Sequence, residues 1–212
     1  MMRSSGSFTT FVGALSMRSD VHARALRVGA TLFLTALTAA AAQLSAPLPF
    51  TEVPFTLQPM VVLLAGLALG SRLALGSQLL YLLAGIAGLP VFAPSGALPP
   101  GALRLLGPTG GYLMAYPLAA WCVGRLAERG FDRRYLPSVL AMAVGLAVIY
   151  AGGAVWLAFF ARSVVQTGAV GLQAALASGV YPFVVADALK LLAAAGIVPG
   201  LWTLFGRMCT PR

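Results

Sequence analysis

Charged residues are scarce in this 212-residue sequence, and acidic ones are scarcest. Only 9% of the residues are charged, whereas soluble domains carry about 25%. Hydrophobic residues make up 59% of the chain and fall in long blocks. This shortage of charge excludes an ordinary soluble domain, and we expect an integral membrane protein.

Lysine, histidine and cysteine are also rare, which excludes several kinds of site. The single lysine, Lys190, follows no glycine-rich loop, so the chain has no Walker A motif and any ATPase must be another chain. The single histidine, His22, argues against histidine-based catalysis. Cys122 and Cys209 lie far apart and predict neither a disulfide framework nor a metal site. We therefore expect no cofactor and no enzyme.

The apolar blocks predict an all-α bundle of six transmembrane helices, because about 17–25 apolar residues span a bilayer. Residues 1–23 are expected to be a cytoplasmic segment without a signal-peptide cleavage site, and residues 24–212 the membrane domain. Ser163–Gly179 is expected to hold a short interfacial helix. The expected spans are Ala25–Ser45, Leu57–Leu69 (a short one), Leu73–Phe92, Gly110–Leu126, Pro137–Ala161 and Tyr181–Phe205.

The arginines predict the orientation of these helices, because basic residues collect on the cytoplasmic side. With six spans and both termini inside, only Arg104 and Arg162 face outward. The net charge of +9 then needs no nucleic-acid partner. The arginines expected in the cytoplasm are Arg3, Arg18, Arg24, Arg27, Arg72, Arg125, Arg129, Arg133, Arg134, Arg207 and Arg212.

Asp187 and Lys190 lie inside the last apolar block, where a lone charge costs about 2.5–3.5 kcal/mol or more. Their i, i+3 spacing places them on one helix face, where each partly neutralises the other. Two interpretations remain open. The pair forms the polar floor of a ligand pocket, or it is an ion pair that fixes helix packing.

Two outward segments offer further candidate groups. Gln58, in the proline-rich segment Pro47–Met60, lies at the entry to the next helix and offers either an amide to a ligand or ordinary helix-start chemistry. In "GPTGGY", the residues Gly107, Thr109 and Gly110 suit a tight helix entry whose backbone N–H groups attract an anion. The alternative, which these residues alone favour, is an ordinary helix start without a ligand. Arg104, just before this segment, pairs a carboxylate or is simply solvated.

Aromatic and small residues complete the candidate set. Tyr81 and Tyr181 are placed near the outer ends of helices, where one of them can stack on a small ring, although membrane aromatics are mostly belt or core residues. Tyr112 is a candidate as the last residue of the "GPTGGY" segment. Ala36 and Ala40 form a small-xxx-small face on the first helix. Such a face docks a partner membrane protein or packs within the bundle.

Four stretches together resemble the BioY family, the biotin-binding S components of energy-coupling-factor (ECF) transporters. They are "VPFTLQ", "LLYLLAGIAGLPVFA", "LGPTGGYLMAYPLAAWCVGRLAERG" and "YPFVVADALKLLAAA". The resemblance implies a six-helix S component with cytoplasmic termini in the cell (inner) membrane of a bacterium or archaeon. It implies a membrane scaffold subunit, docked on Ala36 and Ala40, and a pair of ABC-type ATPases. It also implies that Asp187 and Lys190 face the ureido ring of biotin, with the carboxylate near Arg104.

Other functions remain open on the residues alone. A self-sufficient transporter of biotin or another small solute, with Asp187 as a proton site, needs no ATPase. A membrane enzyme using Asp187 and Lys190 as acid and base lacks other catalytic groups. A purely structural subunit would bind no small molecule.

Overall fold

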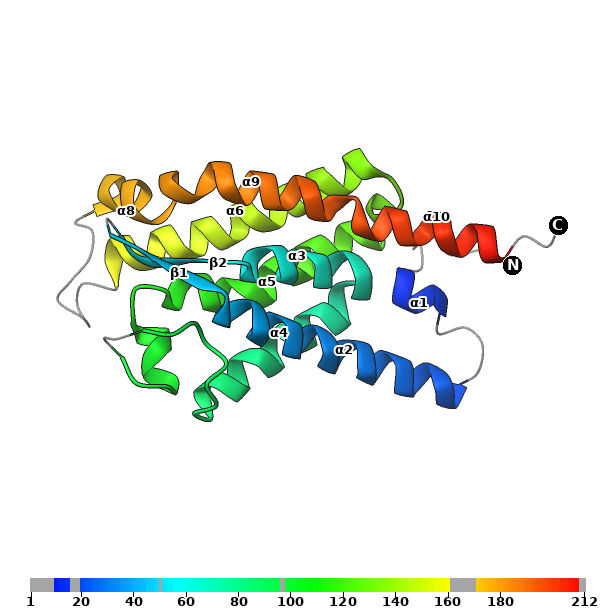
Figure 1. The fold of residues 1–212 in the computed structure, drawn as a ribbon, viewed down its shortest axis with the longest axis horizontal. Helices are drawn as coiled ribbons and strands as arrows, with labels where there is room; N and C mark the ends of the chain where they lie inside the picture. Colours follow the sequence, from blue (N-terminus) through cyan, green and yellow to red (C-terminus); the bar gives the residue numbers. More distant parts are fainter. Residues whose placement is uncertain (1–9, 16–19, 50, 96–97, 161–170, 210–212) are drawn as a thin grey trace, which may run out of the picture.

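The computed structural model describes residues 10–15, 20–49, 51–95, 98–160 and 171–209. Within these residues the fold is helical apart from one two-stranded hairpin (Figure 1). The mainly helical class expected from the sequence is therefore confirmed. The elements are α1 (Phe11–Leu15), α2 (Asp20–Gln43), β1 (Ser45–Leu48), β2 (Thr51–Thr56), α3 (Gln58–Leu69), α4 (Ser71–Ile86), the 3₁₀ helix η2 (Ala102–Leu106), α5 (Gly110–Ala127), the 3₁₀ helix η3 (Phe131–Arg133), α6 (Tyr135–Phe159), α8 (Gly171–Gly179), α9 (Tyr181–Ala195) and α10 (Ile197–Cys209).

In the part of the chain that the structure describes, three stretches of helix are long and apolar enough to cross a membrane. They are His22–Gln43, Tyr135–Phe159 and Tyr181–Leu204. Helix α3 has 12 residues, or about 18 Å at 1.5 Å per residue, against a hydrocarbon core of about 30 Å. The chain is thus a membrane protein with spans of unequal length, and the count of six remains a prediction.

Helix α5 occupies the middle of the bundle, packed against α3, α4 and α6 (Figure 1). Small residues allow the close approach. A side chain at Gly124 of α5 would collide with the backbone of Gly70 and Ser71. Gly70 itself has φ 82°, which lets the chain turn sharply between α3 and α4. The core of the bundle therefore depends on backbone contact as well as on apolar side chains.

The proline-rich segment between the first two predicted spans is a β-hairpin rather than an irregular loop. Strands β1 and β2 are antiparallel, with Ser45 opposite Thr56 and Leu48 opposite Thr51. Proline is compatible with this arrangement because each strand of a two-stranded sheet has an edge that needs no partner. The hairpin lies between α8 and α3 at one end of the bundle (Figure 1).

The last predicted span is divided into α9 and α10 at Gly196. Pro199 lacks the N–H that would continue the helical hydrogen bonds across this point. The expected short helix after α6 is α8, in the described part of Ser163–Gly179. The boundary expected at residue 23 falls within α2, and α1 lies in the preceding segment.

The two ends of the bundle differ in content. Helix α1, the start of α2 and the end of α10 gather at one end, and the hairpin, α8 and the loop with η2 gather at the other (Figure 1). The cavity described next lies at the hairpin end.

Candidate functional site

A cavity lies where β2, α3, α5, α6, α9 and the loop after α4 meet. The space among its lining atoms, including its opening to the outside, is about 630 Å³. Its walls are mostly apolar and aromatic, with a few polar groups. They are Val53, Pro54, Thr56, Gln58, Pro59, Phe92, Ala93, Arg104, Thr109, Tyr112, Leu113, Tyr116, Ile149, Tyr150, Gly179, Phe183 and Asp187.

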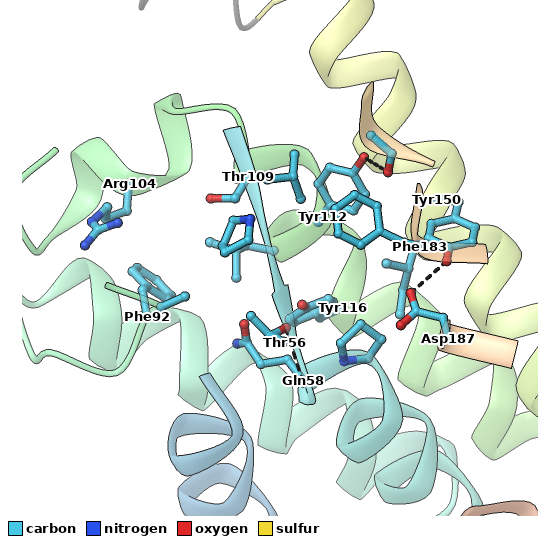
Figure 2. A pocket seen from close by; sticks show the side chains of 17 residues that line it. Thr56, Gln58, Phe92, Arg104, Thr109, Tyr112, Tyr116, Tyr150, Phe183 and Asp187 are labelled. Carbon is cyan, nitrogen blue, oxygen red and sulfur yellow. Dashed lines mark hydrogen bonds between the residues drawn. The ribbon is translucent and has the colours of Figure 1, made fainter. Parts of the chain in front are cut away.

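Asp187 is the buried charged group of this cavity. One carboxylate oxygen, Oδ1, lies 2.5 Å from the Lys190 ammonium, so the predicted i, i+3 ion pair forms. The other oxygen, Oδ2, accepts a hydrogen bond of 2.7 Å from the hydroxyl of Tyr150 on α6 (Figure 2). The Asp187 side chain is only 6% exposed. A cation and a hydroxyl thus hold its charge at a fixed place in an apolar wall.

Lys190 is not among the residues that line the cavity. Its ammonium donates a hydrogen bond of 2.7 Å to the carbonyl of Thr56 and lies 3.9 Å from the centre of the Phe55 ring. It therefore ties α9 to strand β2 while it neutralises Asp187. Sequence spacing could not show this, because Thr56 lies 134 residues away.

Gln58 and Tyr81 form a second polar unit, of which only Gln58 lines the cavity. The Gln58 amide donates a hydrogen bond of 2.6 Å to the Tyr81 hydroxyl. That hydroxyl donates to the Val91 carbonyl at 3.2 Å. Tyr81 is fully buried and packs edge-to-face on Phe92. Tyr81 therefore does not contact the cavity itself, but its hydroxyl holds the Gln58 amide in place.

The side of the cavity opposite Asp187 carries Arg104, from η2, with Thr109 near it (Figure 2). The Arg104 Nε is buried and has no hydrogen-bond partner among the described residues. Burial also lowers the pKa of the guanidinium. An anion in the cavity would satisfy this donor.

The "GPTGGY" segment places Arg104 through a tryptophan. The Gly107 carbonyl accepts a hydrogen bond of 2.8 Å from the Trp156 indole of α6 and another of 3.0 Å from the Gly110 N–H. Neither glycine lines this cavity, whereas Thr109 does. These glycines shape the turn from η2 into α5, and both of their N–H groups are already used, since the Gly107 N–H donates to the Arg104 carbonyl at 3.3 Å.

Tyrosines from two helices, α5 and α6, complete the wall. The Tyr112 hydroxyl donates a hydrogen bond of 2.6 Å to the Gly179 carbonyl and joins α5 to the end of α8. Tyr116 and Tyr150 also line the cavity. Tyr181 is 63% exposed and does not line it. Sequence reasoning missed Tyr150, because nothing near it in its long apolar helix marks it as polar or functional.

Ala36 and Ala40 do not line the cavity and are exposed on α2. Large apolar side chains flank them, with Phe33 63% and Leu32 52% exposed.

Within the described residues, no group of three His, Cys, Asp or Glu side chains is placed to hold a metal ion.

The helix arrangement of this chain also occurs in a solved structure. A solved structure described as the S-component for biotin from an ECF-type ABC transporter matches with a TM-score of 0.74. The match covers 87% of this chain and 94% of that one at 24% identity, so it shows a shared fold.

The chain belongs to the BioY family, whose model matches residues 16–207. A probable biotin transporter BioY from Pyrococcus horikoshii is 41% identical over 79% of this chain and 90% of its own length. The biotin transporter BioY from Thermotoga maritima is 40% identical over 76% and 86%. These relatives are named as transporters, and the family is one of transporters rather than enzymes.

Proposed function

We propose that this chain is the biotin-binding membrane subunit of an ECF-type transporter and that the cavity is its biotin site. One observation carries the proposal: the cavity has a buried carboxylate at one side and a buried, unpartnered guanidinium Nε at the other. Biotin has a ureido ring at one end and a carboxylate at the other. The names of the relatives support the same ligand.

The ureido ring lies against Asp187 in this proposal. The carboxylate accepts from a ring N–H, and Tyr150 keeps it oriented. Lys190 donates to the ureido carbonyl after it releases the carbonyl of Thr56, which accepts its hydrogen bond in this structure. Gln58 offers a further amide, and Tyr112, Tyr116 and Phe183 supply apolar walls. Each polar atom left unpaired in such a pocket would cost about 1–3 kcal/mol.

The carboxylate of biotin lies against Arg104 and Thr109. A planar guanidinium suits a carboxylate, because two parallel hydrogen bonds form. The buried Nε supports this orientation, since an anion would supply the missing acceptor. The reverse orientation, with the carboxylate on Lys190, places a neutral ureido group beside the unpartnered arginine and satisfies it less well.

Uptake is energised by separate subunits, a membrane scaffold and a pair of ATPases. The lack of a Walker A motif supports this division of labour. The chain would cross the inner membrane six times with both termini in the cytoplasm. In support, the start of α2 and the end of α10 lie at the same end of the bundle (Figure 1). Biotin uptake by cells that lack the ATPases would instead favour a self-sufficient transporter.

Calorimetry with the detergent-purified chain tests the site. The parent is expected to bind biotin, and Asp187→Asn and Arg104→Gln are each expected to weaken binding by about 10–100-fold, the usual loss of a charge-assisted hydrogen bond. Arg129→Gln, in the exposed turn after α5, is the matched control and should bind like the parent. A folded parent that binds no biotin would contradict the proposal.

Lys190 needs a second variant, because its removal leaves Asp187 buried without its cation. Lys190→Met is therefore compared with the charge-neutral double variant Asp187→Asn with Lys190→Met. A folded double variant that does not bind biotin assigns the pair to the ligand. A double variant that binds like the parent assigns the pair to helix packing.

A further inference from the structure

A larger hollow, here called the vestibule, adjoins the proposed biotin cavity. The space among the vestibule's lining atoms is about 1960 Å³, including its opening, against about 630 Å³ for the inner cavity. Four residues belong to both walls, so the two spaces are neighbours. They are Pro54, Ala93, Arg104 and Thr109.

Arg104 stands at the junction of these spaces. It lines the inner cavity, the vestibule and a third hollow beside Pro90 and Pro94. No described residue accepts a hydrogen bond from its Nε. A flexible arginine in this place can therefore meet an anion in the inner cavity or one further out.

Glu52 brings a negative charge to the same vestibule. It belongs to β2, is exposed, and lines the vestibule on the chain's outer hairpin. Among the described residues it forms no salt bridge. A free biotin anion gains nothing from a carboxylate here, because like charges repel. A ligand whose outer end carries both charges would use Glu52 and Arg104 together.

We infer that the site also accepts biotin joined by an amide bond to the side chain of lysine, the form released when biotinylated proteins are degraded. This inference rests on the proposed biotin site. The ring system occupies the inner cavity, and the flexible four-carbon stem of lysine passes Arg104 into the vestibule. There Arg104 binds the lysine carboxylate, and Glu52 binds the α-ammonium.

The experiment is competition against radiolabelled biotin on the purified full-length chain. Three competitors separate the charges: biotinyl-lysine, biotinyl-cadaverine with the ammonium alone, and biotinyl-6-aminohexanoate with the carboxylate alone. Biotinyl-lysine is expected to compete within about tenfold of biotin. Glu52→Gln should weaken biotinyl-lysine and biotinyl-cadaverine by about two- to fivefold, as for an exposed ion pair, and should not weaken biotin, because it only removes a repulsion from the biotin anion.

Glu52→Lys provides the opposite charge at the same exposed position. It should weaken biotinyl-cadaverine further and strengthen biotinyl-6-aminohexanoate. The inference is overturned if biotinyl-lysine fails to displace biotin at thousandfold excess, or if changes at Glu52 affect biotin and biotinyl-lysine equally. A folded chain that binds no labelled biotin would instead overturn the proposed function, and this inference with it.

Discussion

At the scale of single residues, the Tyr150 hydroxyl shows how the cavity fixes its main polar group. It donates to Asp187 Oδ2 at 2.7 Å, while Lys190 contacts Oδ1. The carboxylate is thus held from two elements, α6 and α9, and has little freedom to rotate. Its remaining lone pairs face the cavity, where a ligand N–H can reach them.

Tyr150→Phe should therefore weaken biotin binding without unfolding the chain. We expect a loss of about 1–1.5 kcal/mol, or roughly tenfold in Kd, because one hydrogen bond to a charged group is removed. The measurement is calorimetry. Tyr135→Phe is the control. Tyr135 also belongs to α6, and its hydroxyl donates a hydrogen bond to the Leu192 carbonyl, but it does not line the cavity. Equal effects of the two variants would contradict a role for Tyr150 at the site.

Asp132, in η3 between α5 and α6, gives a pH-dependent prediction. The residue is fully buried, and Trp202 of α10 donates to its Oδ2 at 2.8 Å. Burial raises the pKa of this carboxyl, although the Trp202 hydrogen bond and the charge of Arg133 oppose the shift. A raised pKa means that the ionised carboxylate costs stability above the ordinary carboxyl pKa, and that this cost fades as the pH falls.

Asp132→Asn keeps an acceptor for Trp202 but removes the buried charge. We expect its thermal unfolding midpoint to exceed that of the parent at pH 7–8, by about 2–4 °C for each 1 kcal/mol of relief. The difference should shrink toward zero as the pH is lowered to about 4. Thermal unfolding in detergent at several pH values measures this. A difference that grows as the pH falls would contradict the assignment.

At the scale of elements, the contact between α5 and the α3–α4 turn depends on the absence of a side chain at Gly124. A Cβ there would lie 2.5 Å from the Gly70 carbonyl carbon and from the Ser71 Cα. Backbone cannot move aside as a flexible side chain can. The turn is also held by Glu128, whose Oε1 accepts from the Ser71 N–H at 2.8 Å and from its hydroxyl at 2.6 Å.

Gly124→Ala should destabilise the bundle by about 1–3 kcal/mol, the usual cost of overpacking. Gly76→Ala is the matched control, because Gly76 lies in α4 with no atom within 4 Å of its added Cβ. There the helix propensity of alanine predicts a gain of up to about 1 kcal/mol. The measurement is the thermal unfolding midpoint of both variants in detergent. An unchanged midpoint for Gly124→Ala would show that the turn between α3 and α4 can move to admit the added methyl group.

At the scale of the whole molecule, the exposed small-residue face of α2 is where the proposed scaffold subunit would dock. Ala36 and Ala40 are one helical turn apart and both exposed. A helix face that only contacts lipid has no need of small residues. A face that packs against another helix does, because small side chains let the two backbones approach closely. This face lies apart from the cavity, so binding and docking can be separated by mutation.

Replacing both Ala36 and Ala40 with leucine should abolish co-purification with the scaffold and ATPase subunits, and with it energised uptake. Biotin binding by the isolated chain should stay within about twofold of the parent. Ala151→Leu, exposed on α6, is the control and should keep both properties. Co-purification that survives the double substitution would place the docking face elsewhere.

The hydrophobic blocks determined by themselves that this is a helical membrane protein, because their length and lack of charge leave few other structures. Block length also located most helices to within a few residues. It could not show that part of Pro47–Met60 belongs to a hairpin. A strand forms only when a second strand lies beside it, and block length does not record that pairing. Nor could it show the break at Gly196, where apolar composition continues without interruption.

Local spacing determined the ion pair of Asp187 and Lys190, because i, i+3 neighbours meet on any helix. Only the tertiary structure decided what surrounds the pair. It brought Tyr150 and Thr56 to it from 37 and 134 residues away, put Tyr81 behind the wall, and left Tyr181 exposed. Sequence patterns record neighbours along one helix, whereas a cavity is built from faces of several helices whose relative rotation is fixed by packing.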